Sequence, residues 1–260
     1  MIDIISTTKN KTYKYIKALQ QKKTRMRERR FTVEGIKSVR EAAASAMRIA
    51  ITAVSESFYG NENFDYPAEA GLFVVKDELF AGLCDTKTPQ GIIAVIDMPS
   101  HSDFSAIAGK PYIYCDNVSD PGNLGTIIRT ADAAGFGAVL LSPGCADLYS
   151  PKTVRSSMGS FFNIDVVPDF EMPRLFEMKK QGFELYCGAL RKDSMNYTSA
   201  DFKKPSVIIV GNEANGVCDE ILAECRHIII PIQGCAESLN AAVAAAVMMY
   251  ELVRQRSIQG

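Results

Sequence analysis

Residues 207–217 read VIIVGNEANGV, and this stretch decides how the chain is expected to fold. Its first four residues are β-branched, and a short unbroken apolar run is typical of a strand covered on both faces, as in a parallel sheet. The run leads into a loop bounded by Gly211 and Gly216 that carries one carboxylate, Glu213. Glycine permits close approach by a ligand, so a binding loop is predicted at the end of a buried strand. A plain strand-to-helix turn, with Glu213 at the positive helix start, would give the same pattern.

Apolar runs of this kind recur on both sides of the stretch and alternate with helical patterns. The predicted strands are 112–116, 138–142, 164–167, 183–187, 207–210 and 228–232, and the predicted helices are 124–134, 151–160 and 239–256. Ser150 is expected to cap the helix at 151–160, with Pro151 in its first turn. The alternation predicts an α/β domain over 111–260, with a mostly parallel sheet and helices on both faces.

The N-terminal part has the pattern of a smaller α/β domain. We expect a basic helix at 12–30, an amphipathic helix at 35–47, and strands at 31–33, 49–54, 72–75 and 91–96. Residues 98–110 are rich in Pro, Ser and Gly and are expected to form a linker. A length of 260 residues suits two domains, with boundaries at 1–97, 98–110 and 111–260.

The net charge of −1 conceals a strongly basic segment. Between Lys9 and Arg40 there are twelve Lys or Arg residues and only two acidic residues, Glu28 and Glu34. Such a local excess indicates a surface that faces a polyanion. A solvated charged helix would account for the same charges.

The composition argues against several classes of protein and site. No apolar run reaches the roughly 18 residues that span a bilayer, and residues 1–15 contain no signal-peptide stretch. We therefore expect a cytoplasmic protein without membrane contact. The seven cysteines are odd in number and form no Cys-x-x-Cys pair, so we expect reduced thiols and no metal site.

Two further loops follow predicted strands, at the ends where ligands gather in open α/β sheets. One is DNVSDPGN at 116–123, where Asn123 can cap the following helix and Arg129 lies beside its apolar side. The other runs from Pro231 to SLN at 238–240, where Ser238 can cap the terminal helix. Ordinary capped turns would explain both loops, with Arg129 as a surface residue after the first. Neither a P-loop nor a dinucleotide G-x-G-x-x-G motif is present.

Together the three loops resemble the SpoU (TrmH-type) family of RNA 2′-O-ribose methyltransferases, within the SPOUT superfamily. Asn123 and Arg129 match the family's first motif, and Gly211-Asn212-Glu213 matches the second. Pro231 followed by Ser238-Leu239-Asn240 matches the third. Each motif is weak alone, but their order and spacing across residues 123–240 are specific.

The N-terminal part resembles the substrate-binding domain of many family members, which is similar to a ribosomal-protein fold. FTVEG at 31–35 and TPQG at 88–91 carry this looser match. The segment SSMGSFF at 156–162 departs from the family, whose members more often have small residues there. The resemblance then covers nearly the whole chain.

The resemblance implies a fold and a chemistry that periodicity does not show. It implies a deep C-terminal trefoil knot, a homodimer with the active site near the interface, and S-adenosyl-L-methionine as the methyl donor. The implied cofactor-binding residues are Gly211, Ile230 and Leu239. The implied catalytic residues are Asn123, Arg129, Glu213, Ser238 and Asn240.

Arg129 has two candidate roles. Family members are thought to use this arginine to activate the hydroxyl, but a guanidinium with a pKa above about 12 is better suited to clamp a phosphate. Glu213 is the other group that could orient the site or accept a proton. The residues expected to bind RNA phosphates are Lys22, Lys23, Arg25, Arg27, Lys152 and Arg155.

The expected activity is methylation of a ribose 2′-hydroxyl in a structured RNA. Large-subunit ribosomal RNA is favoured over transfer RNA because of the extra N-terminal domain. The alternatives are a catalytically inactive RNA-binding relative and a SPOUT enzyme that methylates a base.

Overall fold

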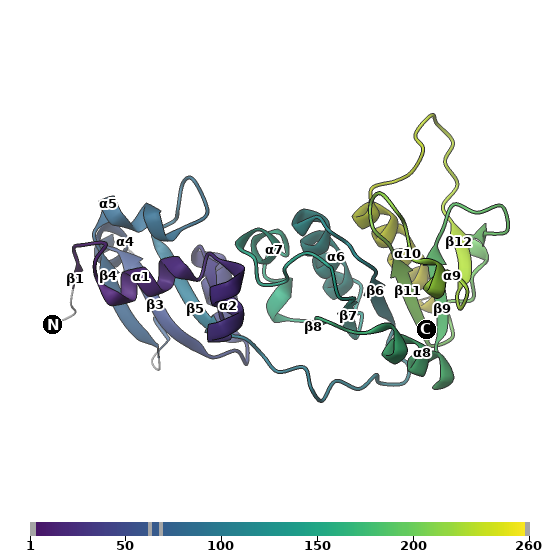
Figure 1. The fold of residues 1–260 in the computed structure, drawn as a ribbon, viewed down its shortest axis with the longest axis horizontal. Helices are drawn as coiled ribbons and strands as arrows, with labels where there is room; N and C mark the ends of the chain where they lie inside the picture. Colours follow the sequence, from purple (N-terminus) through teal and green to yellow (C-terminus); the bar gives the residue numbers. More distant parts are fainter. Residues whose placement is uncertain (1–3, 62–63, 68–69, 258–260) are drawn as a thin grey trace. The chain divides into compact units, whose positions relative to one another are not determined.

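The computed structural model describes residues 4–61, 64–67 and 70–257. The chain forms two compact units. Each unit combines two separate stretches of the chain, so neither corresponds to one continuous part of the colour bar in Figure 1. Unit 1 contains residues 1–100 and 149–162, and unit 2 contains residues 101–148 and 163–260. This division differs from the expected linear boundaries, because residues 149–162 pack with the N-terminal part. In the described ranges no helix is long and apolar enough to cross a membrane.

Unit 1 is built on a five-stranded sheet in the order β1-β4-β3-β5-β2. β4 is parallel to β1 and β3, whereas β5 is antiparallel to β2 and β3. The strands are β1 (Ile4–Ile5), β2 (Arg30–Glu34), β3 (Ile49–Ser55), β4 (Gly71–Val75) and β5 (Ile92–Asp97). The helices are α1 (Lys11–Ala18), α2 (Lys22–Glu28), α3 (Ile36–Ala44), α4 (Glu56–Asn61), α5 (Asp77–Phe80) and α7 (Pro151–Ser156), with 3₁₀ turns η1 (Ala81–Leu83) and η2 (Ser160–Phe162).

The single basic helix expected at 12–30 is wrong, because two short helices and the start of a strand occupy that range. The buried Arg25 accounts for the break. Its Nη1 donates to the carbonyl oxygens of Leu19 (2.8 Å) and Gln20 (2.7 Å), just past the end of α1. Carbonyls at a helix end lack helical partners, and Arg25 supplies one. α2 then ends at Arg29, whose φ of 53° is left-handed.

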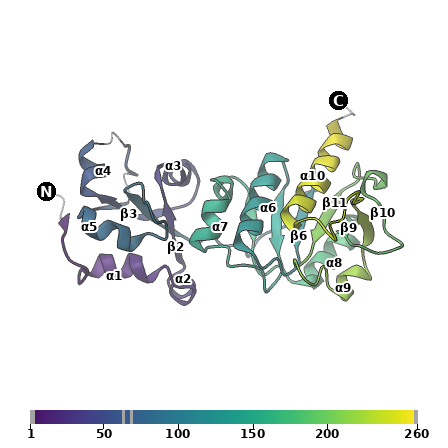
Figure 2. The ribbon, with the colours of Figure 1, turned by 90° about the horizontal axis from the view of Figure 1, so that it is seen from above.

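The apolar side of α1 packs on the sheet of unit 1. Tyr13 and Ile16 are buried with residues of β3 and β5, whereas Lys11, Lys14 and Lys17 of the same helix are exposed. Figure 2 shows α1 and α2 on one side of this sheet and α3 and α4 on the other. The helix therefore presents a basic outer face to solvent.

Unit 2 is built on a seven-stranded sheet in the order β10-β12-β9-β11-β6-β7-β8, in which every pair is parallel. Figure 2 shows α6 and α10 on one face of it and α8 and α9 on the other. The predicted parallel sheet with helices on both faces is therefore confirmed. The strands are β6 (Tyr112–Cys115), β7 (Ala138–Leu141), β8 (Asp165–Val167), β9 (Glu184–Gly188), β10 (Met195–Asn196), β11 (Ser206–Val210) and β12 (Arg226–Ile229). The helices are α6 (Pro121–Ala133), α8 (Met172–Lys180), α9 (Asp219–Leu222) and α10 (Ala241–Ser257), with a 3₁₀ turn η3 (Tyr197–Ser199).

The strand predicted at 228–232 is displaced in the structure. β12 ends at Ile229, and the following residues leave the sheet. Pro231 lacks the N–H group that a continuing strand would need for its ladder. The apolar residues at 230–232 are therefore available to a loop rather than to the sheet.

Two predicted helix caps are wrong and one is confirmed. Asp120 caps α6 in place of Asn123, because its carboxylate accepts the Asn123 N–H at 2.8 Å. Asn240 caps α10 in place of Ser238, because its Oδ1 accepts two backbone N–H groups of the first turn at 3.0 and 3.3 Å. Ser150 caps α7 as predicted. The side chain of Asn123 is thereby left for contacts outside its own helix.

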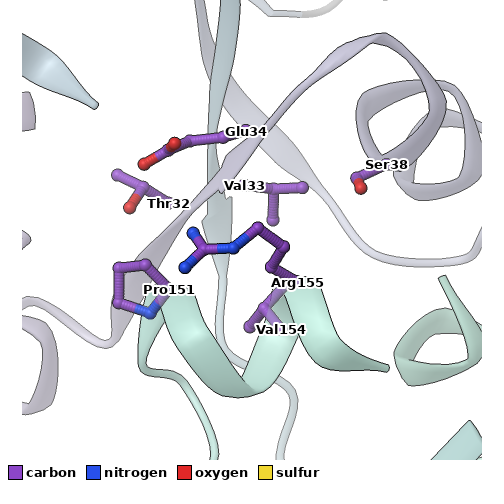
Figure 3. A pocket seen from close by; sticks show the side chains of 7 residues that line it. All are labelled: Thr32, Val33, Glu34, Ser38, Pro151, Val154 and Arg155. Atoms are coloured by element: carbon purple, nitrogen blue, oxygen red, sulfur yellow. The ribbon is translucent and has the colours of Figure 1, made fainter. Parts of the chain in front are cut away.

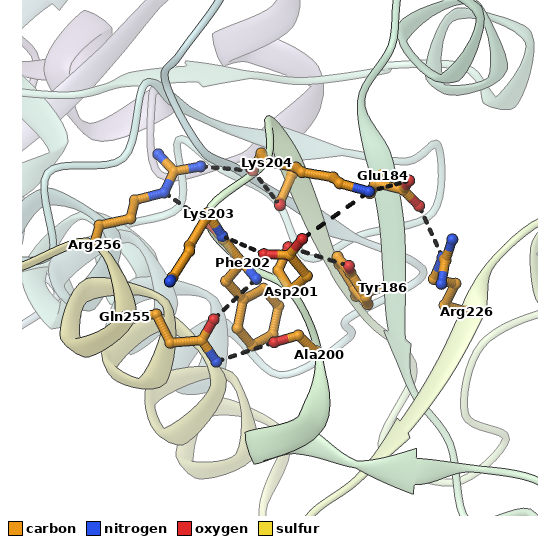
Figure 4. Close-up of polar contacts among 11 residues, drawn as sticks. Glu184, Tyr186, Ala200, Asp201, Phe202, Lys203, Lys204, Arg226, Gln255 and Arg256 are labelled. Atoms are coloured by element: carbon orange, nitrogen blue, oxygen red, sulfur yellow. Dashed lines mark hydrogen bonds and ion pairs between the residues drawn. The ribbon is translucent and has the colours of Figure 1, made fainter. Parts of the chain in front are cut away.

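The end of α10 is fastened to the segment that precedes β11 (Figure 4). Gln255 is buried; its Nε2 donates to the Ala200 carbonyl and its Oε1 accepts the Phe202 N–H, each at 3.0 Å. Arg256 donates to three more backbone carbonyls at 2.9 Å each, including that of Gly109. The end of α10 therefore connects the segment that leads into β6 with the segment that leads into β11.

We expect Gln255→Ala to lower the free energy of unfolding of unit 2 by about 2–3 kcal/mol, because the buried Phe202 N–H and Ala200 carbonyl lose their partners. Urea unfolding followed by circular dichroism measures the change. Ser257→Ala is the control, because the residue is exposed and its hydroxyl donates to the Val253 carbonyl within α10. Equal stability of the two variants would contradict the anchoring role of Gln255.

Candidate active site

The Glu213 side chain connects the loop after β11 to the loop after β6. Its Oε2 accepts the Ser119 N–H at 3.2 Å and the Ser119 hydroxyl at 3.0 Å. Its Oε1 accepts the Asn123 Nδ2–H at 2.8 Å and the Asp120 N–H at 3.3 Å. One carboxylate therefore holds the start of α6 through four hydrogen bonds.

Asn240 connects the third loop to the same group. Its Nδ2 donates to Asn123 Oδ1 at 2.9 Å, while its Oδ1 caps α10. A chain of side-chain hydrogen bonds thus runs from Asn240 through Asn123 to Glu213. The structure brings together the three loops that the sequence motifs identify.

These contacts determine the charge of Glu213. Partial burial raises the pKa of its carboxyl, but the hydrogen bonds from Asn123 and Ser119 outweigh that effect and leave the pKa below its usual value. The group is therefore ionised at neutral pH, with both oxygens already accepting hydrogen bonds. Such a carboxylate is suited to orient the loops and is a poor acceptor for a proton.

The loop after β11 is a tight turn closed by Asn212 and Gly216. These two residues exchange backbone hydrogen bonds of 2.9 Å. The Asn212 Oδ1 also accepts two backbone N–H groups inside the turn, at 3.0 and 3.1 Å. A Cβ atom at Gly211 would collide with the backbone of Gly216. The turn can therefore fold back on the end of β11 only when residue 211 is glycine.

A cavity of about 530 Å³ lies beside this turn, at the carboxyl ends of β9, β11 and β12. This volume and position suit a small organic ligand of an α/β protein. Its walls include apolar side chains of Ile228, Ile230 and Met248, and the charged residues among the described lining are Arg191 and Glu213. In the part of the chain that is described, no group of three or more His, Cys, Asp or Glu could hold a metal ion.

The residues expected to bind the cofactor, Gly211, Ile230 and Leu239, all line this cavity. Ser238 and Asn240 line it as well. The Ser238 side chain is exposed and has no hydrogen-bond partner among the described residues. The cavity and the hydrogen-bonded loops therefore form one continuous site.

Arg129 stands apart from the hydrogen-bonded loops. It is exposed on α6, and within the described ranges its side chain has no hydrogen-bond or ion-pair partner. It is also absent from the described lining of the 530 Å³ cavity. Its guanidinium is therefore open to a second molecule.

Two walls of the cavity lie outside the three sequence motifs. Gly188 and Ala189 reach it from the end of β9, and Ala244 and Met248 reach it from α10. One signal was available, because Gly188 follows an apolar strand just as Gly211 does. The position of β9 beside β11, rather than beside β8, is a matter of strand order, which the local pattern does not contain.

The residues expected to bind RNA fall into different environments. Lys22, Lys23 and Arg27 are exposed on α2. The prediction that Arg25 binds RNA is wrong. Arg25 is only 3% exposed, and its guanidinium donates to the carbonyls at the end of α1. A buried guanidinium in that role cannot present its charge to a phosphate chain.

Lys152 and Arg155 are exposed on α7, which packs against β2 within unit 1. Figure 3 shows Arg155 reaching from α7 toward the strand that carries Val33 and Glu34. Both terminal nitrogens of Arg155 donate to Asp85 Oδ2 at 3.1 Å. An exposed ion pair of this kind contributes little stability and can be exchanged for a phosphate contact.

Comparisons with known proteins agree with this site. Residues 110–250 match the SpoU rRNA Methylase family, and residues 10–94 match the MRM3-like substrate binding domain. The chain is 37% identical over 251 residues to the 23S rRNA (guanosine(2553)-2′-O)-methyltransferase RlmP of Bacillus subtilis. The alignment covers 95% of this chain and 98% of that protein.

Solved structures show the same similarity. An AdoMet-bound rRNA methyltransferase from Sinorhizobium meliloti has a TM-score of 0.88 at 31% identity and covers 97% of this chain and 98% of its own. The SpoU methyltransferase AviRb from Streptomyces viridochromogenes, in complex with AdoMet, has a TM-score of 0.84 at 27% identity and covers 95% of this chain and 98% of its own.

We expect Gly211→Ala to weaken binding of S-adenosylmethionine, the cofactor implied by the motifs, about tenfold or more, because the added methyl group forces the 212–216 turn away from β11. Calorimetric titration measures the Kd. Gly234→Ala is the matched control, since a Cβ there meets nothing within 4 Å. A Gly211→Ala variant that binds as tightly as the control would contradict the role of the turn.

Proposed function

The chain belongs to the SpoU rRNA methylase family, and from this membership we propose that it transfers a methyl group from S-adenosyl-L-methionine to a ribose 2′-hydroxyl of ribosomal RNA. The observation that carries the proposal is the hydrogen-bonded chain Asn240–Asn123–Glu213 beside the 530 Å³ cavity. It joins the family's three motifs into one site.

The cavity has the chemistry that this cofactor requires. Apolar side chains such as Ile228 and Met248 offer a surface for the adenine ring, and Gly188 and Gly211 leave backbone groups open at the strand ends. Arg191 and Glu213 place opposite charges in the lining, which suits a zwitterionic amino acid carrying a sulfonium. When bound, the cofactor supplies an electrophilic methyl group.

The residues of the chain orient this reaction. Transfer of the methyl group would require the ribose oxygen to lie in line with it, so the protein must hold the two molecules in a fixed relative position. Asn123, Glu213 and Asn240 hold the loops that shape the site. Because Glu213 is ionised and fully engaged, the hydroxyl proton would leave to solvent water, and we assign Glu213 an orienting role.

Arg129 and Ser238 are assigned to the RNA and the cofactor, respectively. An exposed guanidinium without a partner among the described residues is suited to clamp the phosphate next to the target ribose, because its planar fork of N–H donors matches phosphate oxygens. The Ser238 hydroxyl faces the cavity without a partner among the described residues and can bond to a polar group of the cofactor.

Ribosomal RNA is favoured over transfer RNA as the substrate class. The relative RlmP is a 23S rRNA methyltransferase and matches the chain over almost its full length. The tRNA (guanosine(18)-2′-O)-methyltransferase of Aquifex aeolicus aligns over 57% of this chain. The MRM3-like match at residues 10–94 supports the larger RNA, as does the basic outer face of α1.

Three finer features belong to the same proposal. Exposed Val243 and Tyr250, 49% and 50% accessible on the same side of α10, support a homodimer. Membership of the SpoU family supports a trefoil knot in unit 2. The bacterial relative RlmP supports a cytoplasmic location.

The reaction is tested with tritium-labelled S-adenosylmethionine and 23S rRNA from a strain that lacks the gene. We expect labelled dinucleotides that resist alkali, because a 2′-O-methyl group blocks cleavage of the adjoining phosphodiester. Arg129→Ala should lower kcat about 100- to 1,000-fold with cofactor affinity unchanged, whereas Thr126→Ala on the same exposed helix side should not. Label recovered in a base would refute ribose methylation.

RNA binding is tested on the exposed lysines of α1 and α2. We expect the combined variant Lys14→Glu, Lys17→Glu, Lys22→Glu and Lys23→Glu to weaken 23S rRNA binding about tenfold or more at moderate salt, and to flatten its salt dependence. The control is Lys192→Glu with Lys203→Glu, two exposed lysines of unit 2. Filter binding that does not distinguish these variants would contradict RNA capture by unit 1.

A further inference from the structure

A second cavity, of about 260 Å³, lies beside the first. Its lining is Asp116, Asn117, Ser119, Gly144, Asn212, Asn215, Gly216 and Cys218. It shares Asn212, Asn215 and Gly216 with the 530 Å³ cavity, so the turn at 212–216 forms a wall of both. The mechanism described above leaves this smaller cavity without an occupant.

The described lining of the smaller cavity consists mainly of polar side chains, none of them cationic. Its described lining offers three asparagine side chains, one hydroxyl, one thiol and one carboxylate, and no Lys or Arg. A phosphate group would therefore meet a negative charge without compensation, which excludes it as the occupant. A neutral planar ligand rich in hydrogen-bonding groups fits the lining, and a nucleobase is such a ligand.

The carboxylate of Asp116 decides which edge of a base can face it. Asp116 is 4% exposed; its Oδ2 accepts the Cys218 N–H at 2.8 Å and its Oδ1 accepts the Asn117 Nδ2–H at 3.3 Å. The Cys218 thiol is also hydrogen-bonded to this carboxylate. The acceptor capacity that remains requires a donor on any base edge that faces Asp116. Guanine presents two adjacent donors, N1–H and N2–H, whereas the edges of adenine, cytosine and uracil place an acceptor beside their donor.

The position of the cavity suits the target nucleotide. Ser119 lines it and also donates to Glu213, so it lies directly beside the hydrogen-bonded loops. A base held there would lie against the turn that separates the two cavities. Enzymes that modify a nucleotide commonly take its base out of the stack into such a pocket.

We propose that the cavity bounded by Asp116, Ser119, Asn212 and Cys218 receives the base of the target nucleotide and selects guanine through the Asp116 carboxylate. This assignment rests on the proposed function, because it places the substrate of that reaction. Asp116 is here a specificity residue that touches the substrate. Asn212 fixes the wall between the two cavities by donating to the Asn117 carbonyl at 2.8 Å.

The test uses guanosine 5′-monophosphate as the probe and the full-length protein saturated with S-adenosylhomocysteine. We expect this nucleotide to shift the side-chain amide resonances of Asn117, Asn212 and Asn215. We also expect it to bind about fivefold or more tightly than the adenosine, cytidine and uridine monophosphates. Asp116→Asn should remove that preference.

Two further variants keep the test decisive if Asp116→Asn disturbs the loop. Cys218→Met fills the smaller cavity only, because Cys218 does not line the larger one, and should weaken guanosine monophosphate binding about tenfold while S-adenosylhomocysteine binding is unchanged. Asp219→Asn carries the same charge change as Asp116→Asn on an exposed residue that lines neither cavity, and should bind as the wild type does.

The assignment is overturned if all four nucleotides bind equally, if none binds at millimolar concentration, or if Cys218→Met binds guanosine monophosphate like the wild type. Transfer of methyl groups to rRNA without any base preference would remove the pocket assignment and leave the proposed reaction intact. Selective binding of guanosine monophosphate without methyl transfer would support the pocket assignment and contradict the proposed reaction.

Discussion

The site depends on one carboxylate whose two oxygens are both committed to a neighbouring loop. Glu213 receives its hydrogen bonds from Ser119, Asp120 and Asn123, which follow a strand nearly a hundred residues earlier in the chain. The parallel pairing of β6 with β11 brings these loops to the same edge of the sheet. Because the carboxylate is ionised there, each bond is charge-assisted, and the geometry of both cavities follows from it.

Much of this arrangement could be predicted from the sequence, and the remainder could not for physical reasons. The unbroken apolar runs identified the parallel strands, since such strands are covered on both faces. The motifs identified Asn123, Glu213 and Asn240, which the structure joins. The caps were misassigned because two residues able to cap stand close together before each helix, and local sequence does not say which one bonds.

Charge counting shows a different limit of sequence reasoning. It treats Lys22 and Arg25 alike, although the first is exposed and the second is buried beneath the end of α1. Only the tertiary structure separates a cation that faces solvent from one that completes a helix. The same holds for Arg155, whose exposed guanidinium already has a carboxylate neighbour in Asp85.

The dual use of Asn240 limits which amino acids the chain can accept at that position over evolutionary time. Its oxygen is occupied by the amides of α10, and its nitrogen is occupied by Asn123. Aspartate retains the acceptor but loses the donor, serine cannot serve both ends at once, and glutamine is one methylene too long for a cap. Divergence at this position therefore has to sacrifice either the start of the last helix or its link to the first motif.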